Sequence, residues 1–175
     1  MNALLVYPKC PDTFWSFTSV LMYIFKKAAF PPLGLMTVAA MLPKDWNITL
    51  VDMNTTPLLD RHIRDADMVF ISAMIIQLDS VREVAARCKD MGKTVVAGGP
   101  LFNARFEDFP EMDHFVLNEA EVTLPPFLAD LAHRARQLHM QFHRSEADAP
   151  PACVLAAGPR PPVPVHDRSE HQSVG

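Results

Sequence analysis

The feature that most constrains the fold of this chain is an alternation of short apolar runs with longer segments of helical periodicity. Short, continuously apolar runs are typical of strands that are buried on both faces of a parallel sheet. The first run is closed by Pro8, and the fourth is closed by Gly98-Gly99-Pro100. The expected strands cover residues 3–7, 47–52, 68–72, 94–97 and 114–117.

Segments with a helical period lie between these runs. In residues 78–91 the apolar side chains fall on one helical face, and Gly92 follows where a helix would end. Residues 33–42 have a similar pattern that ends at Pro43, and a third helix is expected over residues 124–131, with its two prolines in the first turn. Strands that alternate with helices imply right-handed βαβ units. The sequence therefore predicts an α/β fold, a Rossmann-like (flavodoxin-like) doubly wound parallel sheet of about five strands.

The character of the sequence changes near Ser145. From there the chain is rich in proline and polar residues and has no apolar period. Such a segment cannot bury enough apolar surface to offset about 1–2 kcal/mol of backbone entropy per ordered residue. We expect residues 1–144 to form one domain and residues 145–175 to be a disordered tail that contributes almost nothing to stability or ligand affinity.

Charge and cysteine content exclude several classes of protein. The formal net charge is -4 and there is no basic block, which argues against nucleic acid or an anionic membrane as partner. The longest apolar stretch is interrupted by Lys26 and Lys27, so no transmembrane helix is expected. The three cysteines are far apart and match neither a disulfide framework nor a zinc site, so a reducing cytoplasm is the expected location.

A long segment after the first expected strand, residues 9–32, is rich in aromatic side chains. Loops of this length inside a compact domain are usually functional or disordered, and this one is too apolar for simple disorder. Two interpretations stay open, a loop packed on the core and a cover over a ligand. The aromatic part, residues 14–30, is also a candidate docking surface for another chain.

Ligands of open α/β sheets bind beyond the carboxyl ends of the strands, at the point where the strand order reverses. A dinucleotide site needs glycines after the first strand, where this chain has Tyr7-Pro8, and a phospho-receiver domain needs an aspartate where it has Ser72. The strand ends also lack a nucleophile or acid–base set, which argues against a small independent enzyme. A large neutral ligand remains, and Gly98-Gly99 would let it approach the backbone closely.

Five segments, in the expected order, resemble one known family. They read PPLGL at 31–35, LVDMN at 50–54, VFISAM at 69–74, VVAGGP at 95–100 and NEAEVT at 118–123. Order and spacing agree from Met1 to about Leu131. By these motifs the chain is similar to the N-terminal cobalamin (B12)-binding domain of class B radical-SAM proteins.

The resemblance implies a ligand and a site. In that family the strand-end loops hold the corrin and its nucleotide tail, so cobalamin is the implied cofactor. Gly99→Val is then expected to abolish binding while leaving the fold nearly intact. Glu119 and Glu121 are expected on an extended segment, where one of the two carboxylates is expected to accept hydrogen bonds from amide groups of the ligand and the other to have a structural role. The implied cofactor-binding residues are Tyr7, Pro8, Ser72, Ala73, Met74, Gly98, Gly99, Pro100, Leu101, Asn118, Glu119, Glu121 and Thr123.

Two departures from related proteins limit what the resemblance implies. The Cys-x-x-x-Cys-x-x-Cys motif that holds a [4Fe–4S] cluster is absent, so we expect no cluster or S-adenosylmethionine site in this chain, and no catalysis by it alone. A separate radical-SAM domain or chain is a possible partner. Mutase-type cobalamin domains carry Asp-x-His-x-x-Gly, whose histidine ligates cobalt. Asp60-Arg61-His62 imitates its start, but Asp65 replaces the glycine, so we expect His62 to be a surface residue of a short helix.

Two functions of different classes therefore remain. The first is a cobalamin-binding module without catalysis of its own and without a protein histidine on cobalt. The second is a protein-interaction domain that has lost the ligand and uses the aromatic segment 14–30. His139 and His143 share a helical spacing, but no third ligand is nearby, so no other metal site is expected.

Overall fold

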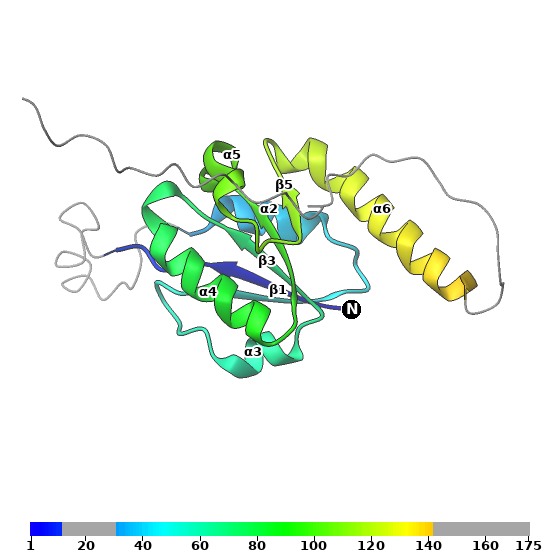
Figure 1. The fold of residues 1–175 in the computed structure, drawn as a ribbon, viewed down its shortest axis with the longest axis horizontal. Coiled ribbons are helices and arrows are strands. Elements are labelled where there is room, and N and C mark those ends of the chain that lie inside the picture. Colours follow the sequence, from blue (N-terminus) through cyan, green and yellow to red (C-terminus); the bar gives the residue numbers. More distant parts are fainter. Residues whose placement is uncertain (12–30, 142–175) are drawn as a thin grey trace, which may run out of the picture.

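The fold is built on one parallel sheet in the order β2-β1-β3-β4-β5 (Figure 1). A computed structural model of the chain describes residues 1–11 and 31–141, with side chains as far as His133. The strand order confirms the doubly wound, flavodoxin-like α/β fold. The strands are β1 (Asn2–Tyr7), β2 (Asn47–Asp52), β3 (Met68–Ser72), β4 (Thr94–Gly98) and β5 (His114–Val116).

Helices cover both faces of the sheet, because right-handed crossovers on the two sides of β1 deliver them to opposite faces. One face packs against α2 and α6, and the other packs against α3, α4 and α5. The helices are α2 (Leu33–Met41), α3 (Asp60–Asp65), α4 (Leu78–Asp90), α5 (Pro100–Arg105) and α6 (Ala120–Gln141), with short turns η2 (Ile75–Gln77) and η3 (Phe106–Asp108).

The alternation of side chains along each strand divides the core into two clusters. Leu4 and Val6 of β1 point toward α3, α4 and α5, whereas Ala3 and Leu5 point toward α2 and α6. All four side chains are buried. A strand buried on both faces needs a continuous apolar run, which is why these strands were recognisable in the sequence.

The predicted strands are confirmed to within one residue at each end, but α6 begins at Ala120 rather than at 124. The early start follows from the turn before it, because Asn118 has a φ of 64° and the carbonyl of Glu119 accepts the amides of Val122 and Thr123. The two prolines of α6 therefore lie inside the helix and not in its first turn. The short helix α5 was not predicted, since six residues are too few to show a period.

No helix in the described part of the chain is long and apolar enough to cross a membrane. The predictions for the aromatic segment and for the tail concern residues that lie almost wholly outside the described ranges.

Cys88 of α4 is fully buried against the sheet, and burial raises the pKa of its thiol to about 11 from an ordinary 9.0. Below pH 9 the thiol is neutral in both states, but between pH 9 and 11 only the unfolded chain releases the proton. Native stability should therefore fall in this window, by about 1–2 kcal/mol near pH 10.5. Urea unfolding should show a smaller loss between pH 8 and pH 10.5 for Cys88→Ala than for the wild type. Equal losses would contradict the assignment.

Candidate functional site

The sheet divides at the carboxyl ends of its two central strands. β1 and β3 pair as far as Val6 and Ile71 and then part. Beyond that point Tyr7 continues beside β2, and Ser72 continues beside Gly98 of β4. This divergence is the switch point at which ligands of open α/β sheets bind.

A cavity of about 230 Å³ opens beside this point, between the ends of β3 and β4 and the helices α2 and α6. Its inner wall is apolar and includes Phe70 and Val96 of the sheet and Leu35 and Leu124 of the helices. Its outer rim carries polar side chains and glycine backbone. The predicted site residues that line it are Ser72, Gly98, Gly99, Pro100, Asn118, Glu119 and Glu121.

The other predicted site residues lie elsewhere. Tyr7 and Pro8 lie at the end of β1, across the switch point from the cavity. Met74 follows β3 and is 40% exposed, whereas Ala73 and Leu101 are buried in the core on the opposite face. Thr123 uses its hydroxyl to donate to the Glu119 carbonyl inside α6. These six residues do not line the cavity.

The two glycines at the end of β4, Gly98 and Gly99, are needed by the protein's own packing. A Cβ on Gly98 would come within 2.9 Å of the carbonyl oxygen of Val116 in β5. Gly99 has a φ of 91°, and a Cβ there would lie 3.2 Å from both the amide nitrogen and the carbonyl oxygen of Ala73. A bulky residue at position 99 would therefore strain this turn, which counts against the expectation of a nearly intact Gly99→Val protein.

The acidic residues on the rim are arranged differently from the prediction. Glu119 precedes α6 and Glu121 lies in its first turn, so the segment is not extended. Both residues line the cavity. Carboxylates are favoured at this end of a helix, because the unpaired backbone amides carry partial positive charge. Asn118 is fixed beside them, since its amide donates to the side-chain oxygen of Asn103 at 2.8 Å.

The turn after β1 is held by side chains from other elements. The Asn54 side chain accepts a hydrogen bond from the amide of Cys10 at 2.8 Å and donates to the carbonyl of Pro8 at 3.3 Å. The hydroxyl of Ser80, in the first turn of α4, accepts from the amide of Lys9 at 2.9 Å. Ser80 therefore holds the turn after β1 and does not cap α4.

The side chains of Tyr7, at the end of β1, and of Cys10, in the turn after it, are uncharged at neutral pH. Burial raises the pKa of the Tyr7 phenol, and the neighbouring Cys10 and Asp52 raise it further. Burial likewise raises the pKa of the Cys10 thiol, with an added contribution from the Asp52 carboxylate. The centre of the carboxyl edge is therefore suited to a neutral ligand.

His62 lies at the other end of the sheet, beside the starts of β1 and β2. It belongs to α3, which leads into the start of β3, and it lines a second hollow beside Asn2 and Asn47, the first residues of β1 and β2. Its Nδ1 accepts the amide of Leu59 at 3.3 Å. This agrees with its expected place in a short helix.

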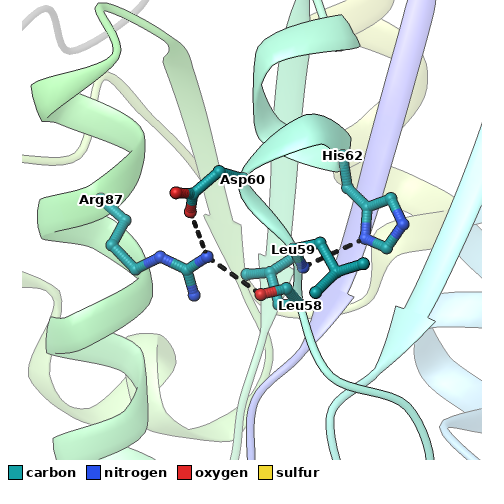
Figure 2. A network of polar contacts seen from close by, with 5 residues as sticks. All are labelled: Leu58, Leu59, Asp60, His62 and Arg87. Atoms are coloured by element: carbon teal, nitrogen blue, oxygen red, sulfur yellow. Dashed lines mark hydrogen bonds and ion pairs between the residues drawn. The ribbon is translucent and has the colours of Figure 1, made fainter.

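An ion pair holds α3 in position beside α4. The Arg87 guanidinium donates to the Asp60 carboxylate at 2.6 Å and to the Leu58 carbonyl at 2.9 Å (Figure 2). Within residues 1–11 and 31–141 no group of three or more His, Cys, Asp or Glu side chains is placed to hold a metal ion.

Sequence reasoning missed the contribution of α2 to the cavity. The segment PPLGL was noted, but its residues were not assigned to the site. Only the structure shows the reason. Gly34 is a helical glycine without positive φ, and no atom lies within 4 Å of a Cβ placed on it, so its missing side chain leaves space beside the cavity. The α2 residues that line the cavity are Gly34, Leu35, Thr37 and Val38.

Comparison with known proteins gives a family and two relatives. A family model described as the B12 binding domain matches residues 27–128. An uncharacterized methyltransferase of Synechocystis sp. is 40% identical over 133 residues, which are 75% of this chain and 25% of the relative. The hopanoid C-2 methylase of Rhodopseudomonas palustris is 31% identical over 131 residues, 74% of this chain and 25% of the relative. The chain thus spans about a quarter of the length of these relatives.

The glycine geometry predicts opposite effects of alanine at two positions. Gly99→Ala should lower the free energy of unfolding by about 1–3 kcal/mol, because φ is positive and the Ala73 backbone is close. Gly34→Ala is the matched control and should raise it by up to about 0.5–1 kcal/mol, since its Cβ enters open space in a helix. Urea unfolding of both variants measures the difference. Equal stabilities would show that the turn at Gly99 is not strained by a side chain.

Proposed function

Because the chain belongs to the B12-binding domain family, we propose that the switch point and the adjoining cavity together hold cobalamin. The nucleotide tail would enter the cavity between the sheet and α2 and α6, and the corrin would lie over the ends of β1 and β3. The observation that carries this proposal is the position of the cavity. It opens at the switch point and brings together seven of the thirteen residues that the resemblance implied.

The size of the cavity fits part of such a ligand. Pockets that enclose a whole drug-sized molecule typically have about 300–1,000 Å³. A cavity of about 230 Å³ is too small for a corrin but suits one branch of a larger molecule. The remainder of the ligand must therefore rest outside it, on the strand ends.

The chemistry of the site also fits. The apolar inner wall suits an aromatic base, and the carboxylates of Glu119 and Glu121 on the rim can accept hydrogen bonds from amide groups of the corrin. Tyr7 and Cys10, neutral beside the switch point, present no charge to the macrocycle. When bound, cobalamin supplies organometallic chemistry that no protein side chain offers.

We further propose that cobalt takes no histidine ligand from this chain. The observation behind this is the location of His62 beside the starts of β1 and β2, whereas the proposed site lies at the carboxyl ends of the strands. The other histidines whose side chains are described, His114 and His133, lie on β5 and α6.

The proposed role in a larger system is to carry the cofactor for methyl transfer. The two relatives are named as a methyltransferase and a methylase, and the matched region is a quarter of their length. We propose that the domain of residues 1–144 acts with a radical-SAM domain, in the same or another chain, and does not catalyse a reaction alone. The free thiols of Cys10 and Cys88 support a cytoplasmic location.

The purified chain should bind methylcobalamin and retain it, with its visible absorption, through desalting in the dark. Gly34→Leu should fill the wall of the cavity and weaken binding at least about tenfold in equilibrium dialysis, which corresponds to about 1.4 kcal/mol. Gly34→Ala is the control and should bind nearly as the wild type does. A folded wild-type chain that stays colourless would contradict the proposal and favour an interaction domain that uses residues 14–30.

His62→Ala should leave the absorption and electron paramagnetic resonance spectra of bound cob(II)alamin unchanged. The reason is its location at the amino end of the sheet, next to Asn2 and Asn47. The spectra are compared for equal amounts of bound cofactor. Loss of nitrogen hyperfine coupling in the variant would show that His62 reaches cobalt after all.

A further inference from the structure

Gln77 is the one polar side chain that is fully buried among the residues that the structure describes, with 1% of its surface exposed. It ends η2, the short turn that follows β3. Buried polar groups are costly unless they are hydrogen-bonded, so the partners of this amide indicate its role.

Both ends of the Gln77 carboxamide bind backbone. Its Nε2 donates to the carbonyl of Pro8, in the turn after β1. Its Oε1 accepts from the amide of Met74, in the turn after β3, at 2.7 Å. The side chain therefore connects the ends of the two strands that part at the switch point.

This connection replaces pairing that the sheet cannot supply. Once β1 and β3 separate, the Tyr7 carbonyl accepts from Met53 beside β2, and the Ala73 amide donates to Gly98 beside β4. The next backbone groups, Pro8 carbonyl and Met74 amide, face the gap between the strands. A carboxamide offers one donor and one acceptor, so it satisfies both groups as a peptide unit of a neighbouring strand would.

We propose that Gln77 is the positioning residue of the cobalamin site, holding the strand ends at the spacing that the corrin requires. This inference rests on the proposed function. The turns that Gln77 connects carry Pro8 and Met74, two of the residues on which the corrin would lie. Without the bridge, the Met74 amide loses its partner and the gap is free to change width.

The surroundings of Gln77 explain why an amide and not a charged group is needed. The Gln77 side chain lowers the pKa of the Tyr7 phenol and of the Cys10 thiol, whereas the neighbouring Asp52 carboxylate raises both pKa values. A carboxylate at position 77 would face the Asp52 charge and the Pro8 carbonyl. When ionised it could not donate to Pro8, but when protonated it would supply both a donor and an acceptor.

Gln77→Glu measured at two pH values therefore tests the bridge. Methylcobalamin affinity is determined by equilibrium dialysis in the dark at pH 6 and pH 8.5. Burial raises the pKa of a glutamate above its ordinary value and toward this range, so more of the side chain is ionised at pH 8.5 than at pH 6. We expect near wild-type affinity at pH 6 and at least about tenfold weaker binding at pH 8.5, the loss expected when one buried hydrogen bond is broken. The methylcobalamin affinity of the wild type should change little between the two pH values.

Two further variants separate positioning from general stability. Gln77→Leu removes both hydrogen bonds and should bind at least about tenfold more weakly at both pH values. Ile63→Val removes a buried methylene in α3 and should lose stability without losing affinity. Circular dichroism confirms that each variant is folded, and if Gln77→Leu does not fold, the pH dependence of Gln77→Glu decides alone.

The outcomes distinguish this inference from the proposed function. A wild-type chain that does not bind methylcobalamin would overturn the proposed function and this role with it. Wild-type binding together with unchanged affinity in Gln77→Leu, or with pH-independent affinity in Gln77→Glu, would overturn the role of Gln77 alone.

Discussion

The parting of β1 and β3 is the constraint on which the rest of the carboxyl edge depends. In a parallel sheet, each strand end must find partners for its backbone groups, and the crossover from β1 runs to β2 while that from β3 runs to β4. The two turns are thus drawn apart, and the chain pairs each with its outer neighbour. The gap that results is both the place where a ligand can reach the backbone and the place where the fold lacks hydrogen bonds. Side chains such as Asn54 and Gln77 supply them.

At the same carboxyl edge, two glycines that were predicted to line the site are required by the fold for a different reason. Gly98 and Gly99 were selected because glycine lets a ligand approach, and both do line the cavity. Their missing side chains, however, make room for Val116, Ser72 and the backbone of Ala73. The turn after β4 must pass close to two neighbouring strands before α5 begins, and this requirement alone would select glycine. Gly34 is different, because open space adjoins the cavity there. A substitution at Gly34 can therefore test contact with the ligand without disturbing the packing of the fold.

The sequence predicted the three central strands well because β1, β3 and β4 are buried on both faces, and burial on both faces leaves a continuous apolar run. The edge strand β2 has a similar run although most of its residues are exposed. The sequence predicted less of the helices and turns. The start of α6 depended on the positive φ of Asn118, and α5 has only six residues, fewer than two helical turns, so neither left a periodic signal. The cavity of the candidate site was predicted in part, because the ends of the strands follow directly from the predicted strands and several residues at these ends line it. The contribution of α2 and the bridging role of Gln77 depend on tertiary contacts between segments far apart in the chain, which no local pattern reveals.

Ion pairs hold the end of the sheet where the strands start, whereas uncharged side chains hold the turn after β1 at the opposite end, where the ligand is proposed to bind. Near the starts of the strands, Arg87 pairs with Asp60, Lys89 pairs with Asp113, and Lys93 donates to the carbonyls of Arg64 and Ala66 at the end of α3. Those groups remain partly exposed, so solvent and salt weaken their attraction. At the opposite end, the turn after β1 is held by neutral amides and hydroxyls, whose geometry is insensitive to salt. A neutral macrocycle placed there would meet directional hydrogen bonds from these groups and from the carboxylates of Glu119 and Glu121 on the cavity rim, and the affinity of the site would depend on how accurately its turns are held.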